Sequence, residues 1–159
     1  MRLTVYTDYA LRVLIYVGLK QGDVSTIGEI AESYDISRNH LMKVVHRLGL
    51  LGYLDTVRGK GGGIRLAREP ECINLGDVVR CTEEDMALVE CFQPGPVKCR
   101  IQPECVLRGA LQEALRAFME VLDRYTLADL LKPERHLARL LAIAEGNRYR
   151  GLATPSRSR

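Results

Sequence analysis

The first fifty residues carry three stretches in which hydrophobic positions recur at helical spacing. The first covers residues 9–20 and follows Thr7 and Asp8, which are typical of a helix start. Its apolar positions are Leu11, Leu14, Ile15, Val17 and Leu19. The second covers residues 26–34, where Thr26 and Glu29 have the spacing of a capping box. The pattern therefore predicts two amphipathic helices before residue 35.

The third stretch follows a turn at residues 35–37, and Ser37 is placed to cap its helix. Its hydrophobic positions share one face and are expected in the core: Leu41, Val44, Val45 and Leu48. The opposite face carries polar and mostly basic side chains: Arg38, Asn39, Lys43, His46 and Arg47. A tight turn before a helix with a basic, polar start is the layout of a helix-turn-helix, whose second helix enters the major groove of DNA.

A hairpin is predicted directly after these helices. Residues 53–57 and 63–67 read as two strands, joined by the glycine-rich residues 58–62. Glycine permits the positive φ of a tight turn, and Arg58 and Lys60 would project as a basic tip. This is the wing of a winged helix, able to reach phosphates or a narrow minor groove. The spacing of the glycines matches no nucleotide-binding motif.

Two further helices are expected. Residues 74–84 form one, with Asn74 as its cap and Leu75, Val78 and Val79 buried. Residues 106–131 form the longest periodic stretch, with one apolar stripe: Leu107, Leu111, Ala114, Leu115, Phe118, Leu122 and Tyr125. So small a head cannot cover this stripe, so we expect a homodimer with the two-fold symmetry that a palindromic operator requires. Packing within one chain is the alternative.

The fold class that follows is mainly α with a small β-hairpin wing. We divide the chain into a winged helix-turn-helix domain at residues 1–84, a cysteine-rich loop at 85–105, a dimerisation helix at 106–132, and a short helix with a disordered basic tail at 133–159.

Charge is unevenly distributed within a net charge of +3. Residues 36–68 contain seven basic residues and one acid, whereas residues 71–132 contain seven basic residues and eleven acids. A focused positive segment indicates nucleic acid as partner, although a solvated charged face is the plain alternative. The expected contacts to double-stranded DNA are Ser37, Arg38, Asn39, His40, Lys43, Arg58, Lys60 and Arg65. No apolar run reaches the roughly 20 residues of a membrane helix, and no signal peptide is evident, so a cytoplasmic protein is expected.

Three cysteines mark the loop between head and long helix. Cys91, Cys99 and Cys105 lack the Cys-x2-Cys spacing of structural zinc sites, and five cysteines in a reducing compartment do not suggest disulfides. An iron-sulfur cluster is the leading cofactor, 4Fe–4S ahead of 2Fe–2S, with zinc or redox thiols left open. Cys72 and Cys81 are expected to be small buried residues. An electron carrier would need neither the basic segment nor the wing, and no catalytic constellation supports an enzyme.

Several runs of residues together resemble the Rrf2 superfamily of winged-helix regulators. They are residues 1–4, 6–12, 37–41, 57–66 and 76–80, together with the three cysteines of the loop. The resemblance extends from residue 1 to about residue 131. Within the superfamily, the chain is most similar to the repressors that sense nitric oxide.

The resemblance implies a homodimeric repressor whose cluster is held by Cys91, Cys99 and Cys105. It also implies that Asp8 supplies a fourth ligand across the dimer, although a carboxylate there also suits the helix dipole. Nitric oxide reacting with the cluster would release the DNA. Arg108 stands where the related regulators of iron-sulfur assembly have a histidine, which disfavours that alternative role.

Overall fold

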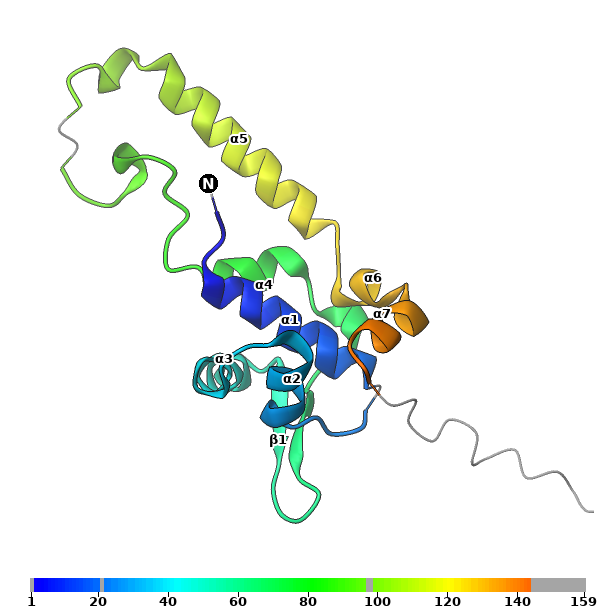
Figure 1. Cartoon of the computed structure of the whole chain (residues 1–159). Coiled ribbons are helices and arrows are strands. Elements are labelled where there is room, and N and C mark those ends of the chain that lie inside the picture. Colours follow the sequence, from blue (N-terminus) through cyan, green and yellow to red (C-terminus); the bar gives the residue numbers. More distant parts are fainter. Residues whose placement is uncertain (1, 21, 97–98, 144–159) are drawn as a thin grey trace, which may run out of the picture.

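The computed structural model describes residues 2–20, 22–96 and 99–143, which form a helical head with one long projecting arm (Figure 1). The elements in chain order are α1 (Val5–Leu19), α2 (Ile27–Tyr34), α3 (Arg38–Leu50), β1 (Leu54–Val57), β2 (Gly63–Leu66), α4 (Leu75–Thr82), α5 (Val106–Asp123), α6 (Leu127–Leu131) and α7 (Glu134–Leu140). The expected class, mainly α with a two-stranded wing, is confirmed. Among the described residues, no helix is both long and apolar enough to cross a membrane.

Helix α1 is the centre of the head. It packs against α3, α4, α6 and β2, so nearly all its sides must be apolar. Val13, Leu14 and Val17 are at most 1% exposed, and Leu41 of α3 and Val78 of α4 are fully buried in the same core. Burial of each such side chain contributes about 1.5–3 kcal/mol, which fixes the other helices around α1.

Helix α1 begins earlier than its sequence predicts. Its N-cap is Thr4, whose hydroxyl accepts a hydrogen bond from the Thr7 amide at 3.2 Å. Thr7, expected at the helix start, is instead fully buried, and its hydroxyl donates to Thr82 Oγ1 at 2.9 Å. Because the hydrogen-bond partner of Thr7 lies 75 residues away, the local sequence does not indicate it. The sequence pattern therefore marks Thr7 as a helix-start residue, although it is buried inside the helix.

The helix-turn-helix is confirmed in detail. Thr26 and Glu29 form both hydrogen bonds of the capping box of α2, and Asp35 takes the left-handed conformation (φ 52°) that turns the chain. The core face of α3 is buried as predicted. Ser37 occupies the N-cap of α3 but makes no capping hydrogen bond, contrary to expectation, and its side chain stays exposed.

The wing is an antiparallel hairpin in which Leu54 pairs with Leu66 and Thr56 with Ile64. Its tip has the predicted positive φ angles, 99° at Gly59 and 79° at Gly61. Reciprocal backbone hydrogen bonds of 2.8 Å between Ser25 and Ile64 tie the hairpin to the segment before α2. The wing is therefore held against the helix-turn-helix.

The arm is shorter than the predicted helix 106–131, because α5 ends at Asp123 and α6 begins at Leu127. Asn74 Nδ2 donates to the Asp123 carbonyl at 2.7 Å, and a Thr126–Asp129 capping box starts α6. Leu127 is 1% exposed and belongs to the core of the head. Hydrophobic spacing continues across this break, so periodicity alone does not show it.

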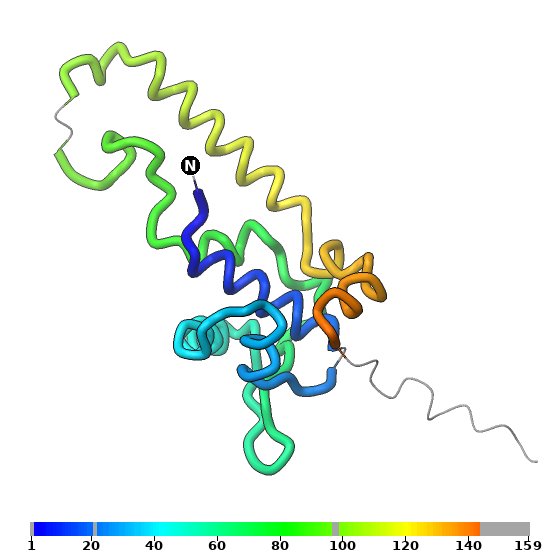
Figure 2. Tube along the Cα trace, viewed as in Figure 1, coloured from blue at the N-terminus to red at the C-terminus, as the bar shows by residue number. Residues whose placement is uncertain are grey.

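The chain after α6 returns to the head (Figure 2). Helix α7 is the short helix expected there, and Leu141 beyond it is 9% exposed. Ser33 Oγ donates to the Leu141 carbonyl at 2.9 Å. The expected disordered basic tail lies at residues 144–159, outside the described residues.

Candidate nucleic-acid interface and cysteine loop

The polar start of α3 forms an exposed surface, which we call the recognition face. It consists of Ser37, Arg38, Asn39, His40 and Lys43, all of them exposed. The opposite side of the same helix is anchored in the core, so these side chains stand on a rigid support. Such a helix presents hydrogen-bond donors and positive charge in the form that the major groove of DNA accepts.

Two side chains of the recognition face lie against neighbouring helices. The Arg38 guanidinium lies beside Gly28, with one of its nitrogens 3.4 Å from where a Cβ of that glycine would be. The His40 ring lies 6.4 Å from the ring of Tyr9 on α1. This contact places the Arg38 guanidinium beside the first turn of α2. The free backbone amides of that turn favour anions, so an anion bound there would also meet the charge of Arg38.

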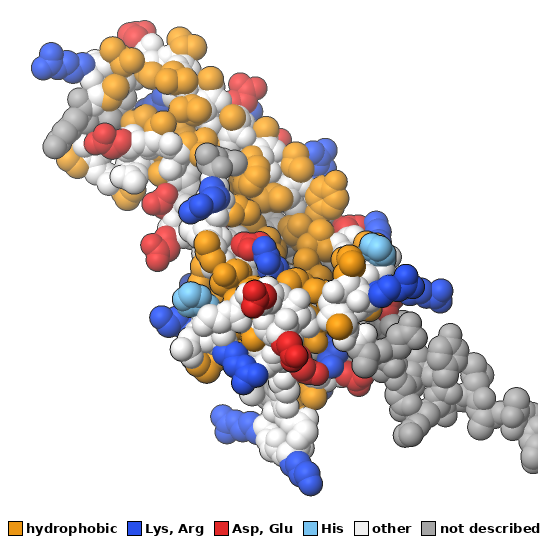
Figure 3. Space-filling view, in the orientation of Figure 1, with side chains coloured by type: hydrophobic (Ala, Val, Ile, Leu, Met, Phe, Trp, Pro, Cys, Tyr) orange, Lys and Arg blue, Asp and Glu red, His pale blue; other side chains and the backbone are white. Residues whose placement is uncertain are grey.

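The wing contributes a second basic surface. Arg58 and Lys60 are exposed at its tip, where Figure 3 shows Lys and Arg side chains projecting beyond the rest of the molecule. Arg65 is exposed on β2, but its guanidinium lies 4.0 Å from the Asp55 carboxylate of the paired strand. Arg65 is therefore partly neutralised, whereas the tip cations are available to phosphates.

Arg68 belongs to the head rather than to this surface. Its guanidinium lies 4.9 Å from the centre of the Tyr53 ring and donates to the Leu51 carbonyl at 3.1 Å. Both contacts fix the end of β2 against the end of α3. Arg68 therefore counts toward the positive charge of residues 36–68, but its guanidinium is occupied by its contacts with Tyr53 and Leu51.

In the structure the cysteine loop begins at Glu83, directly after α4 and two residues before the predicted start at residue 85, and ends at Cys105. It extends away from the wing toward the start of α5 (Figure 1). Its described part contains two 3-10 turns, Glu90–Phe92 and Gln102–Glu104. Cys91 and Cys105 are half-buried and Cys99 is exposed, and none forms a disulfide. Across the described residues, no three His, Cys, Asp or Glu side chains gather as a metal site, so the loop holds the three thiols without bringing them together.

The donor chemistry of the loop fits a soft metal centre. The three cysteines of the loop are free thiols. Cysteine thiolates are the usual ligands of iron-sulfur clusters, and zinc accepts the same donors. Cys105 immediately precedes α5 and occupies its N-cap position. These residues can hold either kind of centre once the loop closes around it.

The remaining cysteines are not buried, contrary to the sequence prediction. Cys72 lies in the 3-10 turn Pro70–Cys72 and Cys81 near the end of α4, and both are exposed. The apolar positions of α4 that face the core are already filled by Leu75, Val78 and Val79. Cys81 therefore lies on the outer side of the helix. The prediction that it is buried relied on residue type alone and is wrong.

Asp8 lies in the first turn of α1 and is half exposed. Its carboxylate pairs with Arg12 at 2.9 Å, and the Arg12 guanidinium lies 5.7 Å from the centre of the Tyr34 ring. Burial raises the pKa of Tyr34 to about 12, so this phenol is neutral near pH 7. Asp8 thus has a structural partner, and within the described residues of one chain it joins no metal-ligand group.

A hydrogen-bonded link joins α1 to the cysteine loop, and nothing in the sequence predicts it. Glu83, the first residue of the loop, accepts hydrogen bonds from the Thr4 amide at 2.8 Å and the Thr4 hydroxyl at 3.0 Å. The two residues are 79 positions apart, so nothing in the local sequence indicates the contact. The turn that carries Asp8 is therefore fastened to the start of the loop.

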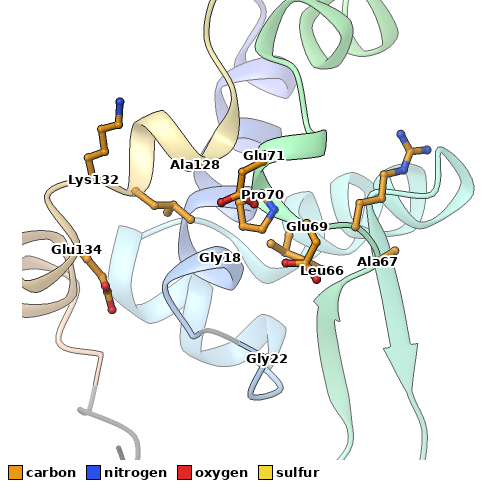
Figure 4. A pocket seen from close by; sticks show the side chains of 12 residues that line it. Gly18, Gly22, Leu66, Ala67, Glu69, Pro70, Glu71, Ala128, Lys132 and Glu134 are labelled. Carbon is orange, nitrogen blue, oxygen red and sulfur yellow. The ribbon is translucent and has the colours of Figure 1, made fainter.

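A hollow of about 790 Å³ lies at the base of the wing (Figure 4). Glu69 and Glu71 line it from the turn after β2, and Lys132 and Glu134 lie on the other side near α6. Its lining combines three acidic residues with a lysine and an arginine, and contains no cysteine. It is therefore separate from the thiol chemistry of the loop.

Comparison with known proteins agrees with this architecture. Residues 3–133 match the model of the Rrf2 family, described as an iron-dependent transcriptional regulator. The HTH-type transcriptional regulator NsrR of Bacillus subtilis is 54% identical over 146 residues, which cover 91% of this chain and 100% of that protein. NsrR of Geobacillus kaustophilus is 52% identical over 147 residues, covering 92% and 100%.

Solved structures show the same fold. CymR, the global cysteine regulator of B. subtilis, superposes with a TM-score of 0.67 at 27% identity, covering 82% of this chain and 95% of its own. T. potens IscR superposes with a TM-score of 0.68 at 27% identity, covering 86% and 90%. The relatives are regulators of transcription and not enzymes. With the helix-turn-helix, the wing and the family match over most of its length, the chain belongs to the Rrf2 family of iron-dependent transcriptional regulators.

Proposed function

We propose that this protein is a nitric-oxide-responsive repressor that binds a palindromic operator as a homodimer while it carries an iron-sulfur cluster. The observation that carries the proposal is the fastening of the cysteine loop to α1 at Thr4 and Glu83. It joins a three-thiol loop to the helix at the centre of a DNA-binding head. The sequence resemblance to nitric-oxide-sensing repressors and the NsrR relatives support the same function.

The recognition face and the wing have different tasks in this proposal. Asn39 offers the acceptor and donor pair that matches adenine in the major groove, and Arg38 offers the two donors that match guanine. Ser37, His40 and Lys43 surround them, while Arg58 and Lys60 reach phosphates or the minor groove. Arg65 adds less because Asp55 lies beside it.

The cofactor would be held by Cys91, Cys99 and Cys105 in the closed loop, as a 4Fe–4S rather than a 2Fe–2S cluster. When bound, it supplies iron that reacts with nitric oxide. Asp8 would complete the ligand set across the dimer, exchanging its Arg12 pair for iron. An oxygen ligand exchanges more readily than a thiolate, which leaves that iron the most accessible to the signal.

Coupling to DNA follows from the contacts of α1. A loop closed by its ligands would hold Glu83 in place, and Thr4 and the Thr7–Thr82 hydrogen bond would hold α1 with it. Because α3 packs directly on α1, the two recognition faces of a dimer would keep a fixed spacing. Opening the loop removes that restraint, and the faces no longer match two successive major grooves.

The test is anaerobic purification followed by an absorption spectrum, iron and sulfide counts, and operator binding before and after nitric oxide. Replacing Cys91, Cys99 or Cys105 with Ser should abolish the cluster and weaken operator binding. Cys72→Ser and Cys81→Ser are matched controls, because both thiols are exposed and outside the loop. A protein that contains zinc but no sulfide, or that keeps its cluster without Cys99, would contradict the proposal.

Asp8 is tested separately by Asp8→Ala. As a ligand, its loss should shift the cluster spectrum and change the rate of reaction with nitric oxide. As a helix-dipole charge paired with Arg12, its loss should lower stability by about 0.3–1 kcal/mol and leave the spectrum unchanged. An unchanged spectrum with unchanged kinetics would remove Asp8 from the site, and His40 would then be the next protein candidate.

A further inference from the structure

We infer that Arg108 is a positioning residue of the cluster site, whose guanidinium donates to the sulfur atoms around the cluster and balances their negative charge. The inference rests on the proposed function and extends it. It assigns a role to a residue that supplies no ligand. Three observations support it: an unpartnered buried nitrogen on Arg108, the place of Arg108 on the helix, and the charge of the loop.

Arg108 Nε is buried and has no hydrogen-bond partner among the described residues. The side chain also forms no ion pair there, although Glu104 stands four positions earlier, at the spacing that favours one. A buried donor on a charged group is unfavourable unless it finds an acceptor. The position therefore calls for an acceptor that the described residues of one chain do not provide.

The place of Arg108 directs it toward the cysteine loop. It lies in the first turn of α5, three positions after Cys105, so the two residues are neighbours on one side of the helix. Leu111, a further three positions on, lines a groove together with Met86 and Leu88 of the loop. Arg108 therefore shares the side of α5 that faces the loop.

The charge of the loop favours a cation beside the cluster. Residues 83–105 contain five acidic residues and two basic ones, before any thiol is deprotonated. Binding a cluster adds three thiolates to this segment. Thiolate and sulfide sulfur atoms accept N–H donors, and such hydrogen bonds, together with local charge, set the stability and reduction potential of a cluster. Arg108 has both the free donor and the charge.

The experiment compares Arg108→Gln and Arg108→Lys with the parent, all purified anaerobically with their clusters. The readouts are the midpoint potential of the one-electron reduction of the cluster and the rate of iron release to a chelator. Removing the positive charge in Arg108→Gln should lower the potential, because the reduced cluster is the more negative form. It should also speed iron release about tenfold, the equivalent of one charge-assisted hydrogen bond. Arg108→Lys should keep most of the parent potential.

Arg116→Gln is the matched control. It lies on the same helix, pairs only loosely with Glu120 at 3.5 Å, and should change neither readout. Equal potentials in the parent and Arg108→Gln would overturn the inference, as would equal effects of the Gln and Lys variants, which would indicate packing rather than charge. A parent protein without iron and sulfide would overturn both this inference and the proposed function, so the two failures are distinguishable.

Discussion

Asn39 and Lys60 represent the two kinds of contact that the DNA-binding surface offers. Asn39 stands on the rigid α3, whereas Lys60 stands at the tip of a two-stranded hairpin. We expect Asn39→Ala to reduce discrimination between operator and altered operator by about 1–3 kcal/mol. We expect Lys60→Ala to weaken all DNA similarly and to reduce the salt slope by about 0.9, the loss of one phosphate contact.

The measurement is a binding titration at several salt concentrations with an operator and a single-base variant. Arg135→Ala on α7 is the control, since this exposed cation lies outside the recognition face and the wing. If neither Asn39→Ala nor Lys60→Ala altered binding, the placement of the helix-turn-helix on DNA would be wrong.

The sequence predicts the positions of some single residues correctly and those of others wrongly. Leu41, Val44 and Leu48 were placed in the core correctly because helical spacing repeats their environment every turn. Thr7 and Cys81 were misplaced, since the burial of each depends on distant partners or on which neighbours already fill the core. Candidate ligands were found by residue type, but the orphaned nitrogen of Arg108 becomes visible only in three dimensions.

At the scale of elements, α4 and α5 meet so closely at Gly76 that a Cβ there would displace the side chain of Asp123. Arg80 binds the Asp123 carboxylate with two hydrogen bonds, of 2.7 and 2.6 Å. A Cβ at Gly76 would collide with that carboxylate. We therefore expect Gly76→Ala to lower the melting temperature, because displacing Asp123 breaks the pair that fixes the base of the arm.

Gly109→Ala is the control for this prediction. Gly109 lies in α5 with open space where its Cβ would be, so alanine there should stabilise the helix by up to about 1 kcal/mol. Thermal unfolding followed by circular dichroism compares the two variants. A gain of stability in both would show that Asp123 moves aside without loss.

The start of α6 should make stability depend on acid pH. The Lys132 ammonium, with the backbone and hydroxyl of Thr126, lowers the pKa of Asp129 from 3.8 to about 2. A depressed pKa in the folded state stabilises it above pH 4 or so, and the contribution is lost as pH falls toward about 2. The difference in melting temperature between the parent and Asp129→Asn should therefore shrink between these pH values. A constant difference would contradict the role of the ionised carboxylate.

Elements with their own caps were predictable, and the junctions between them were not. Thr26 with Glu29 marks α2 in sequence, and both hydrogen bonds form. The break between α5 and α6 depends on Asn74, nearly fifty residues earlier, which holds the Asp123 carbonyl. Continuous apolar spacing from residue 106 to 131 therefore predicted one helix where tertiary contacts make two.

At the scale of the whole molecule, the main feature is the apolar surface that the arm leaves exposed within one chain. Helix α5 has no buried residue within one chain; its Leu107 is 63% exposed, and Tyr125 just after the helix is 47% exposed. Figure 3 shows hydrophobic side chains gathered along this arm. An apolar helix face of this length, on a protein proposed to read a palindrome, fits a second copy of the same helix.

Ala114→Glu tests this arrangement, because Ala114 lies on the exposed apolar side of α5. A carboxylate there would be buried without a partner in a dimer, yet would stay in water in a single chain. We expect a monomer by sedimentation, an unchanged circular dichroism spectrum, and an operator affinity about 10²–10⁴-fold weaker, since two linked half-site contacts become one. Gln112→Glu adds the same charge on the polar side of α5 and should leave the dimer and its affinity intact. A dimer that tolerates Ala114→Glu would place the two-fold axis on another surface and would separate the spacing of the recognition faces from the arm.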